Sequence, residues 1–307
     1  MGEQKTLLFS VCLNCMEFRL AKKEDMLDIA YMICLCFNES IDSIKFYLDN
    51  KFALDRCTVC TIDGKIVSSL SMLATNIYIN GKLEPANYIY AAATLPEHRN
   101  RGCMSKLLEF SCELASTRGE KYSALLPAKD DLYNYYVKIG YESFFKIKFL
   151  NISNEQMRNC VMENSKSNMN DSLKKKCDIY EIRNNICKGI DGSVIWDKQS
   201  VDYALRLNQY FDGSTVFSSD GYAVCFMDNE NCVQVTEFMC KEDGIKNLLT
   251  AIYMQYPLMD YKFRVPVNMN ILNLEGEVRQ FGMIRKIKDG AHNLDGCKHP
   301  YLGLPLD

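Results

Sequence analysis

The sequence has no long uncharged apolar run, little excess charge of either sign and few histidines. Its 36 lysines and arginines nearly balance 39 aspartates and glutamates, which leaves a formal net charge of −3. A chain without net positive charge has no bulk attraction to nucleic acid or to an anionic membrane, so we expect neither as a partner. Of the three histidines, His292 and His299 have no metal-like partners at suitable spacing, and we expect no metal.

An export signal is also lacking. The first residues, MGEQKTLLFSVCLNC, hold an apolar run too short to span a membrane and no small-residue cleavage site. The 15 cysteines are spread through a large core-forming sequence, so we interpret them as reduced thiols of a cytoplasmic protein. Met16 looks like the natural start of the fold, and we predict that residues 1–15 are a disordered extension.

Two Cys-x-x-Cys pairs are present, Cys12/Cys15 and Cys57/Cys60. A four-thiolate zinc site needs this spacing on both arms. The second pair, however, lies in RCTVCTI, which has the pattern of a strand, and residues three apart on a strand face opposite sides. We favour a structural role, with a zinc or redox module as the alternative that metal content after purification decides.

The first half of the chain alternates strands and helices, which predicts a mixed α/β fold. The pairs Asp63-Gly64 and Asn80-Gly81 are strong hairpin signals. Residues 102–117 carry an apolar stripe at helical spacing, Gly140 stops a later helix, and ESFFKIKFL alternates as one strand. The other expected elements are strands at EFRLA, CTVCTI, IVSSLSML, residues 87–94 and YSALLP, and helices at residues 23–36 and 43–48.

A polar stretch then separates a second ordered region. It could hold a short helix at ISNEQMRNCV, and the rest has the composition of a linker. Beyond it, the helix SVDYALRLNQYF, the strands YAVCFM and VQVTEFMC and the helix GIKNLLTAIYMQY echo the order of the first half. We predict an extension at 1–15, an N-terminal domain at 16–152, a linker at 153–177 and a C-terminal domain at 178–307.

The stretch ATLPEHRNRGCMSKLLEF joins a strand to a helix and is suited to an anion. A helix N-terminus offers unpaired backbone N–H groups and the positive end of the helix dipole. Gly102 allows the backbone to approach a ligand closely, and Arg99 and Arg101 add positive charge. Taken alone, this pattern does not distinguish a phosphate site from a solvent-facing turn.

With LYNYYVKIGYESF downstream, the stretch resembles two motifs of the GCN5-related N-acetyltransferase (GNAT) family. The first is the coenzyme A loop, Arg/Gln-x-x-Gly-x-Gly/Ala, in which Met104 stands where a second Gly or Ala is usual. The second is aromatic-Tyr-x-x-x-Gly-Phe/Tyr, with Tyr136 as its tyrosine and Gly140-Tyr141 as its close. The resemblance covers residues 16–150. The whole chain resembles the tandem branch of the enhanced-intracellular-survival type, with a degenerate second half lacking the loop and no room for that branch's sterol-carrier-like domain.

The resemblance implies a GNAT fold with a second, degenerate GNAT-like half, and an acetyl-CoA-dependent transfer to a primary amine of a small molecule or peptide. Tyr136 would donate a proton to the departing sulfur, because the reference pKa of a phenol, about 10, lies above that of a thiol. The backbone before the helix would hold the thioester carbonyl and pantetheine. The implied cofactor-binding residues are Ala92, Ala93, Thr94, Arg99, Asn100, Arg101, Gly102, Cys103, Met104, Ser105, Asp131 and Leu132.

The general base is not evident, because NYIYAAATL carries no carboxylate where many relatives have a glutamate. In the survival-type enzymes the C-terminal carboxylate is implicated, and here Asp307 ends an apolar tail, PYLGLPLD, that could tuck into the fold. We expect His98 to be a solvated loop residue. The alternative function is a non-catalytic acyl-CoA-binding or interaction protein that keeps the fold without turnover. The sequence does not decide the amine or whether copies of the chain associate.

Overall fold

The computed structural model describes residues 16–164, 178–228 and 230–304. The chain divides into two compact units, Met1–Met72 with Ala91–Ser111 and Leu73–Tyr90 with Cys112–Asp307. The elements with residues in the first unit are β1 (Met16–Leu20), η1 (Lys23–Asp25), α1 (Met26–Phe37), α2 (Ile41–Asn50), η2 (Leu54–Arg56), β2 (Cys57–Ile62), β3 (Lys65–Ile79), β4 (Lys82–Thr94), η3 (Pro96–His98) and α3 (Cys103–Thr117).

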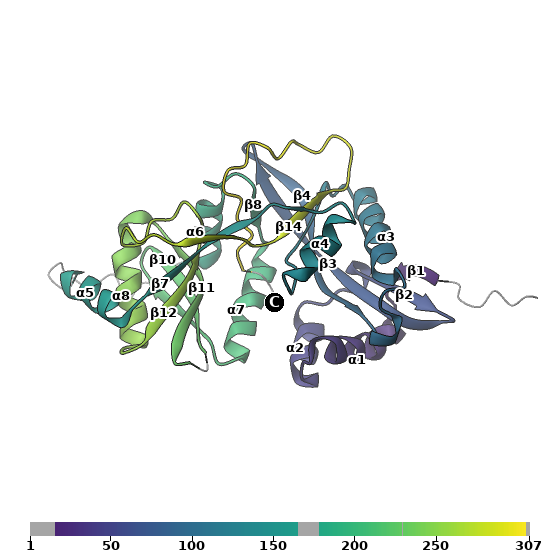
Figure 1. Ribbon diagram of the computed structural model, residues 1–307, viewed down its shortest axis with the longest axis horizontal. Helices are drawn as coiled ribbons and strands as arrows, with labels where there is room; N and C mark the ends of the chain where they lie inside the picture. Colours follow the sequence, from purple (N-terminus) through teal and green to yellow (C-terminus); the bar gives the residue numbers. More distant parts are fainter. Residues whose placement is uncertain (1–15, 165–177, 229, 305–307) are drawn as a thin grey trace, which may run out of the picture. The chain divides into compact units, whose positions relative to one another are not determined.

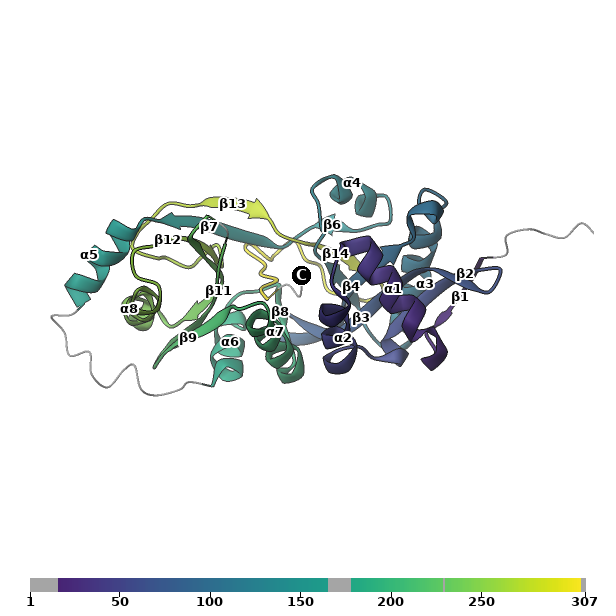
Figure 2. The same cartoon turned by 90° about the horizontal axis from the view of Figure 1, so that it is seen from below.

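The first unit is an antiparallel arrangement of β1, β2 and the start of β3, covered on both faces by helices (Figure 1). The β2–β3 hairpin turns at Asp63 and Gly64, both with positive φ, as the Asp-Gly pair predicts. In this unit α1 and α2 lie against one face and α3 against the other (Figures 1 and 2). The apolar stripe of α3 is buried at Leu107, Leu108 and Ala115, which confirms the predicted packed helix.

The second unit holds the remaining strands. Its elements are β5 (Tyr122–Leu125), α4 (Asp131–Val137), β6 (Glu142–Ser143), β7 (Lys146–Ile152), α5 (Asn154–Asn164), α6 (Ile179–Cys187), β8 (Ser193–Ile195), α7 (Lys198–Tyr210), β9 (Ser214–Ser218), β10 (Gly221–Met227), β11 (Cys232–Cys240), η4 (Glu242–Gly244), α8 (Ile245–Gln255), β12 (Asp260–Val265), β13 (Glu277–Gln280) and β14 (Met283–Lys286).

Two runs of strands cross this unit. One has the order β3-β4-β5-β14-β6, with β8 added to β3, and the other has the order β13-β7-β12-β11-β10-β9. In the first run β4 and β5 are parallel and joined by a helix, and in the second β11 and β12 are parallel and joined by α8. The echo seen in the sequence is therefore a repeated topology: a strand, a crossover helix and a parallel strand. The described chain is a mixed α/β protein with two sheets, as the alternation of strands and helices predicts.

The ESFFKIKFL segment is not the single strand that its alternation predicts. It breaks at Phe144 and Phe145 into β6, which pairs with β14, and β7, which pairs with β12 and β13. At the break, Phe144 N–H donates to the Gly282 carbonyl at 3.2 Å, and Phe281 N–H donates to the Phe145 carbonyl at 2.8 Å. The two segments around the break thus form one antiparallel ribbon that enters both runs of strands (Figure 2).

The second run of strands is covered on both faces. Alternate residues of β10 and β11, among them Ala223, Cys225, Val233 and Val235, share a core cluster with the apolar face of α8. The opposite face of β10 and β11 meets α6 (Figure 1). Double coverage explains why β10 is buried over five consecutive residues rather than alternately.

Candidate functional site

The end of β4 departs from regular strand geometry just before the predicted thioester-binding residues. β4 pairs with β5 over Ala86–Tyr88. Ala91, further along the strand, has φ +51°, a left-handed value that is uncommon for a residue with a Cβ. Ala92 and Thr94 are half-buried and Ala93 is buried. A backbone turned at Ala91 can aim peptide groups of residues 92–94 at a ligand rather than at β5, with which β4 pairs only over Ala86–Tyr88.

The turn that opens α3 also has left-handed backbone. Asn100 has φ +61° and Gly102 has φ +79°, and α3 begins at Cys103. Lys106 N–H donates to the Gly102 carbonyl at 3.1 Å, the first helical hydrogen bond, so the backbone N–H groups of residues 102–105 lie in the first turn, where a helix offers no carbonyl partner. A Cβ added at Gly102 would meet nothing within 4 Å. The space over this glycine is open to a ligand.

The structure brings the strand end and the turn together. The Arg99 Nε donates to the Thr94 carbonyl at 3.2 Å, and the Cys36 thiol of α1 donates to the same oxygen at 3.2 Å. Arg99, Asn100 and Arg101 are exposed. Two guanidinium groups therefore stand beside a helix N-terminus, and one of them is tied to the strand that the resemblance assigns to the thioester.

The side chains of Cys103, Met104 and Ser105 are less accessible. The Cys103 thiol is buried, and Met104 and Ser105 are half-buried. Cys103 and Ser105 would reach a phosphate through their backbone N–H groups. Met104, which stands where the motif usually has Gly or Ala, is half-buried in the first turn of α3.

The cysteine pair in β2 has the properties of core thiols. Cys57 and Cys60 are both buried, and burial raises the pKa of each thiol to about 12. Zinc binds thiolates, so this environment favours the protonated, non-ligating form. Cys12 and Cys15 lie outside the described residues. Within 16–164, 178–228 and 230–304, no three His, Cys, Asp or Glu residues are grouped as a metal would require.

Tyr136 lies on α4 in the second unit, and its ring packs edge-on against Tyr135 and Tyr141 at 5.2 and 5.8 Å. Burial raises the pKa of its phenol to about 12, and the neighbouring Tyr135 adds to this. Asp131 and Leu132, also predicted to bind the cofactor, form the first turn of α4, with Asp131 exposed and Leu132 half-buried. Because its pKa is raised to about 12, Tyr136 holds its proton throughout the neutral range.

A chain of buried hydrogen bonds holds Tyr141, the residue whose ring packs against Tyr136. The hydroxyl groups of Tyr141 and Ser123 are 2.7 Å apart, Ser123 donates to Asn87 Oδ1 at 2.8 Å, and Asn87 Nδ2 donates to Glu120 at 2.8 Å. Asn87 and Ser123 face each other in the β4–β5 register. This chain of hydrogen bonds was not predicted from the sequence. Its signal was a polar residue at the middle of each of two apolar strands.

The solvated role expected for His98 is not what the structure shows. The residue ends η3 and is half-buried, and its Nδ1 is buried with no hydrogen-bond partner among the described residues. This imidazole stands one residue before Arg99.

The C-terminal tail tucks into the second unit, as its apolar sequence predicts. Tyr301, Leu302 and Leu304 are buried. Val194 N–H of β8 donates to the Tyr301 carbonyl at 2.9 Å, and Trp196 Nε1 donates to the Gly303 carbonyl at 3.1 Å. Asp307 itself lies outside the described residues.

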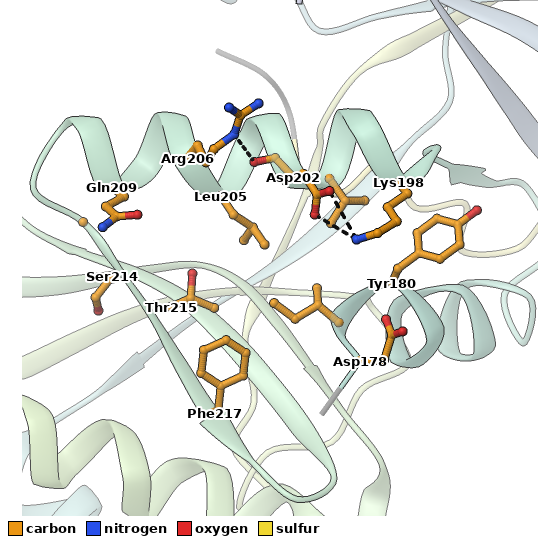
Figure 3. A pocket seen from close by; sticks show the side chains of 13 residues that line it. Asp178, Tyr180, Lys198, Asp202, Leu205, Arg206, Gln209, Ser214, Thr215 and Phe217 are labelled. Atoms are coloured by element: carbon orange, nitrogen blue, oxygen red, sulfur yellow. Dashed lines mark hydrogen bonds and ion pairs between the residues drawn. The ribbon is translucent and has the colours of Figure 1, made fainter. Parts of the chain in front are cut away.

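A separate hollow of about 740 Å³ lies in the second unit among the start of α6, α7 and β9 (Figure 3). Its charged groups are already engaged: Lys198 Nζ lies 3.2 Å from Asp202, Arg206 Nε donates to the Asp202 carbonyl at 3.4 Å, and Asp178 caps α6. Two cations and two carboxylates line this hollow, so its lining has no net charge that would favour an anionic or a cationic ligand.

The strand end, the left-handed turn and the helix start all lie in the part of the chain that matches a known family model. Residues 17–144 match the family model described as "Acetyltransferase (GNAT) domain". No curated protein matches the sequence.

Solved structures extend the likeness to both halves. A probable N-acyltransferase from Enterococcus faecalis covers 89% of this chain and 73% of its own, with 16% identity and a TM-score of 0.69. A GCN5-related N-acetyltransferase from Anabaena variabilis covers 89% of this chain and 73% of its own, with 14% identity and a TM-score of 0.70. Eis1 from Mycobacterium abscessus covers 89% of this chain and 74% of its own, with 14% identity and a TM-score of 0.63. At such identities the likeness shows the fold. No helix in the described ranges has the length and apolar character needed to cross a membrane.

Proposed function

We propose that this protein is an acetyl-CoA-dependent N-acetyltransferase that moves an acetyl group to a primary amine of a small molecule or peptide by direct attack. The observation that carries the proposal is the left-handed turn from Asn100 to Gly102. It opens α3, is tied through Arg99 to the end of β4, and lies in the stretch that matches the GNAT acetyltransferase domain.

The turn would bind the pyrophosphate of acetyl-CoA. Backbone N–H groups at the start of a helix point toward an anion, and the helix dipole favours negative charge there. Arg99 and Arg101 would add charge-assisted hydrogen bonds. The net charge of the chain is −3, so binding depends on this local arrangement and not on the overall field.

The backbone of residues 92–94 would hold the thioester carbonyl and the pantetheine arm. When a neutral amine attacks the carbonyl carbon, negative charge develops on the oxygen. Preorganised N–H groups aimed at that oxygen stabilise the tetrahedral intermediate more than the substrate. The left-handed Ala91 changes the backbone direction of β4 beyond its pairing with β5, while β3 still flanks the stretch on its other side.

Tyr136 would act on the departing sulfur. At a pKa of about 12 its phenol is protonated at working pH, yet it is a weaker acid than an ordinary thiol, whose pKa is about 8.5. The hydroxyl therefore stabilises the thiolate first through a hydrogen bond. Complete proton transfer becomes favourable where the sulfur shares the same dry surroundings, because desolvation raises the pKa of a thiol as well.

The attacking amine must arrive neutral or lose a proton. The carboxylate at the end of the chain, on Asp307, is the group we propose for this step, which is also the arrangement implied by the resemblance to the survival-type tandem enzymes. The burial of Tyr301, Leu302 and Leu304 supports the proposal, because it fixes the tail as far as the last described residue.

A thiol-release assay with acetyl-CoA and a panel of polyamines, aminoglycosides, amino acids and peptides tests the proposal. We expect at least one amine to give release well above that of the Tyr136→Phe variant. If no amine does so while CoA still binds, the chain is an acyl-CoA-binding protein without turnover.

A further inference from the structure

Helix α1 of the first unit is apolar on two faces, and only one of them is buried. The exposed face carries Leu27, Tyr31 and Leu35, spaced four residues apart and 84%, 65% and 48% exposed. A surface helix normally has one apolar face, with charged residues opposite it. We call these three exposed residues the α1 stripe. The buried face consists of Ile29, Ala30, Met32 and Ile33.

The α1 stripe leaves another side of the helix to the proposed binding region. The half-buried Cys36, which lies away from the stripe by helical spacing, donates its thiol hydrogen to the Thr94 carbonyl at the end of β4. Figure 2 shows α1 on the near side of the first unit. A partner that covers the stripe therefore leaves the Cys36 side of α1 against the strand end.

The exposed apolar surface around the stripe is large. Phe37 and Ile41, which follow the stripe at the connection from α1 to α2, are 41% and 63% exposed. Together with the stripe they expose on the order of 600 Å² of surface, as much as the largest apolar patch of a typical monomer. Two such patches facing each other would bury roughly 1,200 Å², which reaches the range of specific protein interfaces. The area is sufficient for a dimer of this chain.

The row of residues spaced by four continues to an exposed lysine at one end and an exposed glutamate at the other. Lys23 lies four residues before Leu27, in η1, and Glu39 lies four residues after Leu35. When the i, i+4 ridges of two helices pack antiparallel, each row lies along the other. Leu27 then lies beside the partner's Leu35, and Lys23 lies near the partner's Glu39. The row is therefore complementary to itself, as a two-fold symmetric interface requires.

A membrane surface fits the stripe less well. Helices that lie in the membrane interface carry lysine and arginine on their polar face. Helix α1 contains neither, and its charged residue is Asp28. The charges of the helix thus disfavour an anionic lipid surface.

We propose that this chain forms a symmetric dimer through the α1 stripe, with the two α1 helices antiparallel and Tyr31 at the two-fold axis. An aromatic side chain at the centre of an interface, with charged residues at its rim, is the usual arrangement. The inference does not depend on the proposed catalysis, because it concerns the outer face of α1.

Sedimentation velocity over a range of protein concentrations tests the dimer. We expect the wild type to dimerise reversibly, and Tyr31→Arg to raise the Kd of the dimer by about 100-fold, because two like charges then meet at the axis. The matched control is Met254→Arg, which changes a 57% exposed residue on helix α8 of the second unit. We expect the control to dimerise as the wild type does. Circular dichroism verifies that both variants are folded.

An exchange of the end charges tests the antiparallel arrangement. Lys23→Glu places a negative charge near the partner's Glu39, and we expect it to raise the Kd of the dimer about 10-fold. The double variant Lys23→Glu/Glu39→Lys brings opposite charges together again, so its Kd should return to near the wild-type value. In this variant the Ser43 hydroxyl loses the Glu39 carboxylate but keeps its hydrogen bond to the Ser40 carbonyl.

A wild type that stays monomeric up to about 100 μM would overturn the proposal, and the stripe would then be covered within the chain or by another protein. A dimer that Tyr31→Arg leaves intact would also overturn it, because the interface would lie elsewhere. A double charge exchange that dimerises more weakly than Lys23→Glu would refute the antiparallel arrangement. Should Tyr31→Arg not fold, Leu27→Arg changes a more exposed position of the stripe, and the same loss of the dimer is expected.

Discussion

Gly102 and Gly64 lie in the same unit and have nearly the same backbone conformation. Comparing the same substitution at the two positions therefore distinguishes a binding role from a structural one. Their φ values are +79° and +75°, and a Cβ on either would meet nothing within 4 Å. An alanine at either position therefore costs only backbone strain, about 1 kcal/mol. One glycine opens α3, and the other closes the β2–β3 hairpin.

We predict that Gly102→Ala and Gly64→Ala lower the unfolding free energy by similar small amounts, and that Gly102→Ala alone weakens acetyl-CoA binding. The reason is that strain at residue 102 moves the backbone N–H groups that follow it. Urea unfolding and acetyl-CoA titration of both variants provide the measurement. Equal affinities for CoA in the two variants would refute a phosphate role for the turn.

The ionisation of Tyr136 gives a second prediction at this scale. Burial raises the pKa of its phenol to about 12, so the proton is present at all pH values below that. We predict that kcat shows no alkaline decline from Tyr136 up to pH 10, while Tyr136→Phe lowers kcat by roughly 10²-fold or more across the whole range. A pH profile of kcat for both proteins checks this. An alkaline limb near pH 8 to 9 that disappears in the variant would contradict it.

At the scale of elements, the paired segments around Phe144–Phe145 and Phe281–Gly282 join the two halves of the sequence. β14 from the second half pairs with β5 and β6, and β7 from the first half pairs with β12 and β13. Removing either half leaves strand edges of the other without partners, and such edges invite aggregation.

We therefore predict that residues 16–164 and 178–307 are insoluble when produced separately and form a folded complex when produced together. Affinity capture of one tagged piece, followed by detection of the other, measures this. Cooperative unfolding of residues 16–164 on their own would show that β14 is dispensable. The domain boundaries at 152 and 178 stay a prediction until this is done.

The elements that the sequence predicts well are those with local signals. Both Asp63-Gly64 and Asn80-Gly81 form two-residue hairpins with positive φ, and α3 follows its apolar stripe. The break at Phe144 was not predictable from ESFFKIKFL, because its alternation continues through the break and a segment 130 or more residues away imposes the change. Nothing local marks Ala91 for left-handed φ in a run of three alanines, nor β8 and β14 as short strands paired over long range.

The whole molecule carries many buried groups that are neutral at pH 7 and ionise only at high pH. Burial raises the pKa values of Tyr122 and Tyr136 to about 12, and it does the same for the thiols of Cys57, Cys60 and Cys225. A raised pKa in the folded state means that the folded protein keeps protons which the unfolded chain releases. The stabilisation is complete below the unfolded pKa and is lost as pH rises toward the folded value.

We predict an unfolding free energy that these groups leave unchanged from pH 7 to about 8, that begins to fall as unfolded thiols ionise near 8.5, and that falls steeply above 10 as tyrosines follow. Urea midpoints at pH 8 to 11, with tyrosinate absorbance recorded in parallel, measure it. A midpoint that stays constant to pH 11 would contradict the burial of these groups.

The central claim is that the turn from Arg99 to Ser105 binds acetyl-CoA, and an equilibrium titration of acetyl-CoA tests it most directly. The wild type and an Arg99→Ala/Arg101→Ala variant would be titrated at two salt concentrations. We predict saturable binding to the wild type that weakens with salt, and in the variant a lower affinity with a shallower salt dependence, because two charge-assisted contacts are lost. Absence of binding, or equal affinity in both proteins, would contradict the account.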